Sequence, residues 1–156
     1  RKGTTFSLYF PAYQKTASDE QAKQVEAPDL HLGDAELVLV VEDNPQVRRL
    51  SVQRIRELGY RTLEAETGDE ALQILAERPD IALVFTDLVM PGTTSGLELA
   101  AKVSADRPDT KVLLTSGYAD EIAQPQAESA IHFDLLRKPY RQADLAKMLH
   151  TLLSDH

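Results

Sequence analysis

The chain has 156 residues, no cysteine, 42% hydrophobic residues and a formal charge of −8, a composition typical of one folded domain with room for additional segments. The absence of cysteine excludes disulfides, thiolate metal sites and cysteine nucleophiles, and it suits a reducing compartment. Because 25 Asp and Glu outnumber 17 Lys and Arg, we expect no direct binding to nucleic acid.

The sequence contains no apolar run long enough to span a bilayer, and its N-terminal RKGTTFSLYF lacks the apolar core of a signal peptide. We therefore expect a cytoplasmic chain without membrane contact. Because the chain opens on Arg1 rather than Met, we also expect it to be part of a longer protein, which could carry a membrane anchor elsewhere.

Two segments precede the predicted domain. Residues 1–12 contain an alternating run rich in aromatic and β-branched types, TTFSLYF, which predicts one strand that ends at Pro11. Residues 13–35 are polar and small and lack a sustained apolar period, which predicts a linker. The folded domain is then expected over residues 36–156.

Apolar strands alternate with amphipathic helices through this domain. We expect strands at residues 37–41, 61–65, 81–86, 111–115 and 132–136. We expect helices from Pro45 until Gly59, at 68–76 and 96–105, weakly at 120–124, and from Arg141 onward. The residues predicted to face inward include Val47, Leu50, Ile55 and Leu58 in the first helix and Leu97, Ala100 and Ala101 in the third. Five such strands predict a doubly wound α/β domain, with a parallel sheet covered on both faces.

Polar residues stand where several of these strands end. Glu42 and Asp43 follow the first strand and Asp87 follows the third. Thr115 ends the fourth strand, and Lys138 follows the fifth. In open parallel sheets, sites form beyond the carboxyl ends of the strands, where the strand order reverses. With the strand order 2-1-3-4-5, these side chains would converge at one edge of the sheet.

The predicted cluster has the chemistry of a phosphoryl-transfer site. Its three carboxylates would repel one another, since two charges about 4 Å apart cost roughly 4 kcal/mol at an effective dielectric constant of about 20. A hard divalent cation such as Mg²⁺ relieves this repulsion, because it prefers oxygen ligands. Lys138 and Thr115 can donate to the same oxygens. Asp87 would then be the nucleophile that becomes an aspartyl phosphate.

Each of these residues also has a simpler interpretation. A single Asp at a strand end is most often a helix cap or a loop residue. The Glu-Asp pair before Asn-Pro could only cap a helix, and a Lys-Pro pair usually lies on the surface. The common position of all of them at one predicted sheet edge favours the functional interpretation.

Four motifs resemble those of the receiver domain of two-component response regulators, over residues 37–153. They are VLVVEDN, VFTDLVMPG, LLTSGYA and LLRKPY, in this order along the chain. The resemblance implies a flavodoxin-like receiver fold and a phosphoacceptor that takes a phosphoryl group from phosphohistidine onto Asp87. It also implies Mg²⁺, or Mn²⁺, as the cofactor.

The resemblance gives a role to individual residues and implies a partner. The metal ligands would be Glu42, Asp43, Asp87 and the backbone carbonyl of Val89, and the catalytic residues would be Asp87, Thr115 and Lys138. The phosphodonor would be a histidine kinase or a histidine phosphotransfer domain. The chain itself would be a monomer or a weak dimer.

The amino-acid sequences of these motifs, taken together, are most similar to those of receivers attached to hybrid sensor histidine kinases. The segment KGTTFSLYFP resembles the last strand of the kinase ATP-binding domain, so residues 1–12 would be a remnant of that domain. The parent protein would then be a sensor histidine kinase. The fragment lacks the kinase's histidine and nucleotide-binding boxes, so its own chemistry would be self-catalysed phosphotransfer and slow autodephosphorylation, and whether it counts as an enzyme stays open.

The chain departs from the family pattern at several positions. Leu135 stands where the family usually has an aromatic residue, and the loop PGTTSG is one residue longer than the common form. Pro125 predicts a short or irregular fourth helix. Gly117 and Val89 provide no side chain to position an attacking water, so we expect a long-lived phosphoryl group.

Two other classes of protein are the alternatives. A pseudo-receiver would bind partners without being phosphorylated, but the complete acidic set with Thr115 and Lys138 argues against it. A flavin protein would need a phosphate-binding loop where Glu42 and Asp43 stand, and an Asp-dependent phosphatase would need a second Asp at Val89. None of the four histidines has metal-ligand spacing.

Overall fold

The computed structural model describes residues 35–117 and 133–154, which form alternating strands and helices. The strands are β1 (Leu37–Val41), β2 (Arg61–Ala65), β3 (Ile81–Asp87), β4 (Lys111–Ser116) and β5 (Asp134–Arg137). The helices are α1 (Pro45–Glu57), α2 (Gly68–Glu77), α3 (Gly96–Asp106) and α5 (Gln142–Ser154). Within these residues, no helix is both long and apolar enough to cross a membrane.

The five strands form one parallel sheet in the order β2-β1-β3-β4-β5. This is the order predicted from the sequence, and the doubly wound fold class is confirmed. The order reverses direction between β1 and β3, because the chain builds outward from β1 on one side and from β3 on the other. The carboxyl ends of β1, β3 and β4 are therefore neighbours.

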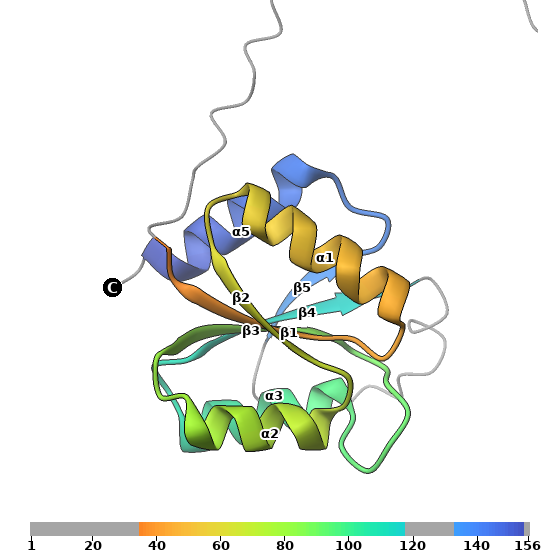
Figure 1. Cartoon of the computed structure of the whole chain (residues 1–156), viewed down its shortest axis with the longest axis vertical. Helices are drawn as coiled ribbons and strands as arrows, with labels where there is room; N and C mark the ends of the chain where they lie inside the picture. The colour runs from red at the N-terminus through yellow and green to blue at the C-terminus, as the bar shows by residue number, and fades with distance from the viewer. Residues whose placement is uncertain (1–34, 118–132, 155–156) are drawn as a thin grey trace, which may run out of the picture.

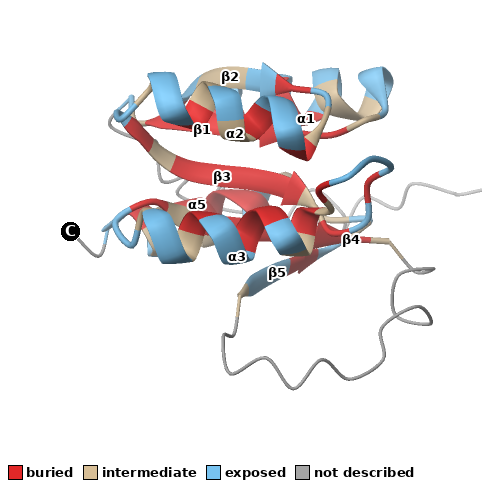
Figure 2. Cartoon of the chain, turned by 90° about the horizontal axis from the view of Figure 1, so that it is seen from below, coloured by how far each residue is buried: buried red, intermediate tan, exposed pale blue. Residues whose placement is uncertain are grey.

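Helices cover both faces of the sheet (Figure 1): α1 and α5 lie on one face, and α2 and α3 lie on the other. Alternation along β1 divides its side chains between the two layers, since Val38 and Val40 pack with α1 and α5 while Leu39 and Val41 pack with α2 and α3. Figure 2 shows that β3 is buried along nearly its whole length. Each buried Val or Leu contributes roughly 1.5–3 kcal/mol, so the strands that carry the predicted site are firmly held.

The inward face of α1 differs from the prediction at Leu50, whose side chain is 48% exposed. Asn44 caps this helix by accepting from the backbone N–H groups of Gln46 and Val47, and Pro45 occupies its first turn. The buried face is centred on Ile55. Leu50 lies five residues earlier, which is about 140° around the helix, so it points away from the core.

The inward face of α3 also differs in part from the prediction. The buried apolar residues are Leu99, Ala100 and Val103, whereas Ala101 is exposed. Ala101 precedes Val103 by two residues, which places it about 200° around the helix and on the solvent side. Small apolar residues give no sequence signal that separates these two sides.

The observed boundaries differ from the predicted ones by one or two residues. β3 extends to Asp87, β4 extends to Ser116, and β5 begins at Asp134 rather than at residue 132. The predicted strand in residues 1–12, most of the linker and the predicted fourth helix at 120–124 lie outside the described residues.

Candidate functional site

The carboxylate at the end of β3 is carried by a closely packed backbone. Asp87 is the last residue of β3 and pairs in register with Thr115 of β4. The start of α3 lies directly against it, since a Cβ built on Gly96 would be 1.7 Å from the carbonyl oxygen of Asp87. Only a residue without a side chain fits there, so α3 restrains the backbone that carries this carboxylate.

Lys138 joins the ends of β1 and β3. Its Nζ donates to Asp87 Oδ2 at 2.8 Å and to Glu42 Oε2 at 3.1 Å. The backbone N–H of Lys138 donates to the carbonyl of Ser116 at 2.8 Å, and the Lys138–Pro139 peptide bond is cis. The structure thus brings Glu42, Asp87 and Lys138 together, as the sequence predicted.

The electrostatics of this cluster are those of two carboxylates that share one ammonium. Burial raises the pKa of Glu42, the nearby Lys138 opposes that shift, and the negative charge of Asp87 adds to it. Burial also works against the charge on Lys138, but the bonds to Asp87 and the charges of both carboxylates outweigh it and raise its pKa. With Lys138 charged and both carboxylates ionised, the cluster carries one excess negative charge.

One oxygen of the cluster has no partner among the described residues. Asp87 Oδ1 is buried and accepts no hydrogen bond from any of them. A buried carboxylate oxygen without a donor is costly, and such an oxygen commonly marks the place of an ion or a ligand group. Hard oxygen donors with excess negative charge fit a divalent cation such as Mg²⁺.

The other predicted metal ligands are not joined to this cluster. In the part of the chain that the structure describes, no three His, Cys, Asp or Glu side chains lie close enough together to share a metal ion. Asp43 is half-buried, and no hydrogen bond or ion pair links its side chain to another described residue. Val89 follows Asp87 in the loop after β3, and its side chain is 53% exposed.

Thr115 lies beside Asp87 but does not contact its carboxylate. The side chain is buried, and its hydroxyl donates to the carbonyl of Thr86 at 3.4 Å, a long hydrogen bond. The backbone carbonyl of Thr115 accepts from the N–H of Leu88 at 2.8 Å. The register between β3 and β4 thus brings Thr115 next to the site, and a rotation of its side chain would be needed to reach a group on Asp87.

Arg48 holds the acidic turn after β1, a role that the sequence did not predict. Its Nη1 donates to the backbone carbonyl of Glu42 at 2.6 Å, and its Nε lies 3.7 Å from Glu64 Oε2 on β2. The backbone N–H of Asn44 donates to Glu42 Oε1 at 3.3 Å. The only sequence signal would have been an arginine on the first turn of α1, close enough to reach back to the end of β1.

The loop between β3 and α3 is tied to the start of α2, which the sequence also did not predict. The hydroxyls of Thr93 and Thr94 both donate to the carboxylate of Asp69. These two bonds lower the pKa of Asp69. A Cβ built on Gly68 would lie 2.5 Å from the carbonyl oxygen of Thr94, so the loop backbone touches α2 directly.

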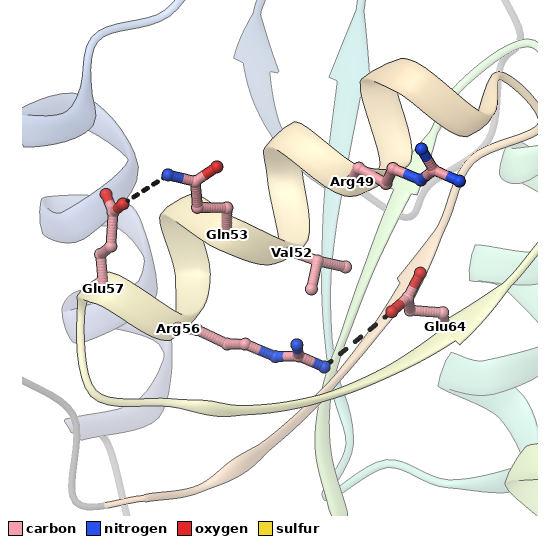
Figure 3. A pocket seen from close by; sticks show the side chains of 6 residues that line it. All are labelled: Arg49, Val52, Gln53, Arg56, Glu57 and Glu64. Atoms are coloured by element: carbon pink, nitrogen blue, oxygen red, sulfur yellow. Dashed lines mark hydrogen bonds and ion pairs between the residues drawn. The ribbon is translucent and has the colours of Figure 1, made fainter.

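A groove of about 450 Å³ lies between α1 and β2, and it shares no residue with the cluster of Glu42, Asp87 and Lys138. Figure 3 shows its lining, which consists of Arg49, Val52, Gln53, Arg56, Glu57 and Glu64. Arg56 reaches across the groove to within 3.9 Å of Glu64. The mixed charges of this surface favour neither an anion nor a cation.

An open doubly wound sheet with two carboxylates and a lysine at its carboxyl edge is the arrangement expected of a receiver domain. The sequence model of the response regulator receiver domain matches residues 38–150. The chain belongs to this family.

Two relatives show where such domains occur. The sensor kinase CckA of Brucella abortus (strain 2308) is 34% identical over 160 residues, which cover 97% of this chain and 17% of the kinase. The response regulator receiver protein CpdR of the same organism is 30% identical over 116 residues, which cover 74% of this chain and 95% of that protein. The chain therefore spans less than a fifth of the sensor kinase and nearly all of the separate receiver protein.

Solved structures share the fold. The receiver domain of the hybrid histidine kinase CckA superposes with a TM-score of 0.60 at 30% identity, over 75% of this chain and 98% of that one. The response regulator TrrA of Thermotoga maritima, crystallised in complex with Mg²⁺ and BeF, superposes with a TM-score of 0.66 at 30% identity, over 76% of this chain and 99% of that one.

Proposed function

We propose that this chain is the phosphoacceptor receiver of a two-component phosphorelay, in which Asp87 takes a phosphoryl group from a phosphohistidine. The observation that carries the proposal is the position of Lys138 Nζ, 2.8 Å from Asp87 and 3.1 Å from Glu42. An ammonium at this place can pair with an oxygen of the incoming phosphoryl group, directly beside the carboxylate that would receive it.

In the proposed reaction, an oxygen of Asp87 attacks the phosphorus atom and the P–N bond to the donor histidine breaks. The electron pair of that bond stays on the imidazole nitrogen. Lys138 and Thr115 would donate to phosphoryl oxygens, once the Thr115 hydroxyl has turned from the carbonyl of Thr86. Donors held in place before the reaction stabilise the developing charge without further reorganisation.

Glu42 and Asp87, the two carboxylates that the structure brings together, fit Mg²⁺ or Mn²⁺. Glu42, Asp43, Asp87 and the backbone carbonyl of Val89 would hold the cation. When bound, the cation would neutralise carboxylate and phosphoryl oxygens. One observation supports this assignment: Asp87 Oδ1 is buried and accepts no hydrogen bond from the residues that the structure describes.

The parent protein would be a sensor histidine kinase of the cytoplasm or of a membrane with this part in the cytoplasm. Residues 1–12 would be the end of its ATP-binding domain, residues 13–35 a linker and residues 36–156 the receiver. The alignment with the sensor kinase CckA supports this division, because it covers 97% of the chain and therefore includes most of the N-terminal segment. The phosphodonor would be a histidine kinase or a histidine phosphotransfer domain.

The donor protein would approach along a groove of about 200 Å³ beside Lys138. Its lining residues come from α1 and from the segment after β5, and they are Val47, Leu50, Ser51, Arg54, Lys138, Pro139 and Tyr140. The exposed Leu50 gives this groove an apolar edge next to the reactive lysine. Such an edge suits contact with a partner helix.

Intact-protein mass after incubation with Mg²⁺ and a small acyl-phosphate donor tests the proposed function. We expect one phosphoryl adduct that requires Mg²⁺ and is absent from Asp87→Asn. Asp106→Asn is the matched control, because Asp106 is an exposed acid at the end of α3, and it should form the adduct. No adduct in a folded wild-type chain would overturn the proposal and favour an interaction module that is not phosphorylated.

The phosphoryl group would be lost slowly. Gly117 lies just beyond β4, and Val89 lies two residues after Asp87; neither side chain can hold an attacking water by a hydrogen bond. We expect the adduct to persist for many minutes after the donor is removed. Loss of the label within seconds in a phosphate-release assay would contradict this expectation.

A further inference from the structure

Arg54 of α1 contacts the segment that follows Lys138, between β5 and α5. The guanidinium of Arg54 lies 5.5 Å from the centre of the Tyr140 ring, a cation–π arrangement. Its Nη1 donates to the backbone carbonyl of Tyr140 at 3.4 Å. The backbone carbonyl of Arg54 in turn accepts from Gln142 Nε2 at 2.8 Å. Arg54 therefore contacts the β5–α5 segment through its side chain and through its backbone.

Tyr140 extends these contacts to the strand that carries the phosphoacceptor. Its ring meets that of Phe85 edge to face, with centroids 6.3 Å apart. Phe85 precedes Asp87 by two residues on β3. The Tyr140 hydroxyl also lies 3.4 Å from Ser51 Oγ, a buried group on α1. The ring is thus held between α1 and β3, two residues after Lys138.

On one side, the backbone of Lys138 is held to β4, because its N–H donates to the carbonyl of Ser116. On the other side, α5 begins only at Gln142, after Tyr140 and Arg141. A side chain that must span from this segment to both Asp87 and Glu42 depends on where its backbone lies, since displacements of about 1 Å can cost a large part of a reaction rate. In Figure 1 the segment between β5 and α5 runs beside α1. The hydrogen bond from Arg54 to the carbonyl of Tyr140 joins the two.

We propose that Arg54 is a positioning residue for phosphoryl transfer: by holding Tyr140 on α1, it keeps Lys138 Nζ between Asp87 and Glu42. This inference rests on the proposed function, because it concerns the same lysine. Arg54 contacts neither carboxylate, so it acts through Lys138 alone.

The test uses the whole chain and a small acyl-phosphate donor, which needs no docking surface. We expect Arg54→Met to lower the phosphorylation rate at saturating Mg²⁺ and donor by about 3- to 10-fold, the factor that corresponds to loss of one partly exposed cation–π contact and its hydrogen bond. The Mg²⁺ concentration for half the maximal rate should stay within about twofold, because the metal ligands are not touched. A general loss of structure would change both quantities.

Further variants separate positioning from charge and from folding. Arg54→Lys keeps the charge but not the planar guanidinium, and it should recover only part of the rate. Arg49→Met removes the same charge from the exposed side of α1, and it should match the wild type. Tyr140→Leu should resemble Arg54→Met, and the double variant should be no slower than either single one, because both remove the same contact.

The decisive measurement repeats Arg54→Met in a Lys138→Met background. We expect Arg54→Met to have no further effect there, since Lys138 is the group through which it acts. An equal fold-loss in both backgrounds, or a wild-type rate in Arg54→Met alone, would overturn the inference while leaving the proposed function intact. A wild-type chain that takes no phosphoryl group would overturn both. Circular dichroism and melting temperature verify that each variant is folded.

Discussion

The charge at the site comes from the ammonium of Lys138 and the carboxylates of Glu42 and Asp87. Lys138 is half-buried, and its only recorded side-chain partners among the described residues are the two carboxylates. Without this ammonium, Glu42 and Asp87 would face each other as like charges in a poorly solvated place. In the proposed reaction, the same charge that joins the two carboxylates would be available to the phosphoryl group.

Replacing Lys138 tests this dual role. We expect Lys138→Met to lower the initial rate of phosphorylation by a small acyl phosphate at least about 10-fold, which corresponds to about 1.4 kcal/mol of lost transition-state stabilisation. Lys147→Met, an exposed change on α5, is the control for the loss of one positive charge. Equal rates for Lys138→Met and the wild type, measured by intact mass over time, would show that the ammonium does not contact the transferring group.

The buried carboxylate of Glu42 should make stability depend on pH. Because burial raises the pKa of Glu42 above that of a free glutamate, the folded chain binds this proton more tightly than the unfolded chain does. The contribution to stability is then present at low pH and is lost as the pH rises through the folded pKa. Glu42→Gln has no carboxyl group to ionise. The free energy of unfolding of this variant, relative to that of the wild type, should therefore be higher near pH 7 than near pH 4.

Urea unfolding at the two pH values measures this difference. Glu77→Gln provides a control on the exposed side of α2, and its stability relative to the wild type should change little with pH. A gap between Glu42→Gln and the wild type that is the same at both pH values would mean that burial does not perturb the carboxyl group.

At the scale of elements, the start of α3 determines where Asp87 lies. Gly96→Ala would place a methyl group on top of the Asp87 carbonyl oxygen, so helix and strand must move apart. We expect a loss of about 1–3 kcal/mol in the free energy of unfolding and a much slower phosphorylation. Ala101→Gly, on the exposed face of the same helix, should cost about 1 kcal/mol with little change in phosphorylation rate. Similar rate losses in both variants would attribute the effect to stability alone.

Strand positions and strand order were predictable because they depend on local patterns. Continuous apolar runs marked β1, β3 and β4, and the polar residue after each run marked the end at which the site forms. The prediction for Leu50 was wrong because an apolar side chain on a surface helix can be retained for contact rather than for the core. Periodicity alone does not separate these two cases.

Contacts between loops and helices were not predictable from the sequence. Arg48, Arg54 and Asp69 bind groups on loops whose course depends on the packed fold. No spacing along the chain relates Asp69 to Thr94 or Arg54 to Tyr140, because these pairs meet only after the sheet has formed. The missed residues are those whose partners lie on loops or on distant elements, whereas the candidate site residues could be listed from the strand ends alone.

At the scale of the whole molecule, the site exists only in the folded chain. Glu42, Asp87 and Thr115 stand at the ends of three different strands, and Lys138 follows a fourth. The unfolded chain scatters these groups, so a ligand that needs all of them binds only the native state. Occupancy of the site should therefore be visible as an increase in global stability.

Mg²⁺ with beryllofluoride, the combination crystallised with TrrA of Thermotoga maritima, provides the means to measure this increase. At a concentration of about 100 times its Kd, such a ligand adds about 2.7 kcal/mol to the free energy of unfolding. For a domain of this size we expect the melting temperature to rise by on the order of 10 °C. Asp87→Asn should lose most of the rise, because the fluoride complex would mimic a phosphoryl group on that carboxylate. An equal rise in Asp87→Asn would show that the ligand binds elsewhere, and Mg²⁺ alone, added to both proteins, separates the effect of the cation from that of the phosphoryl mimic.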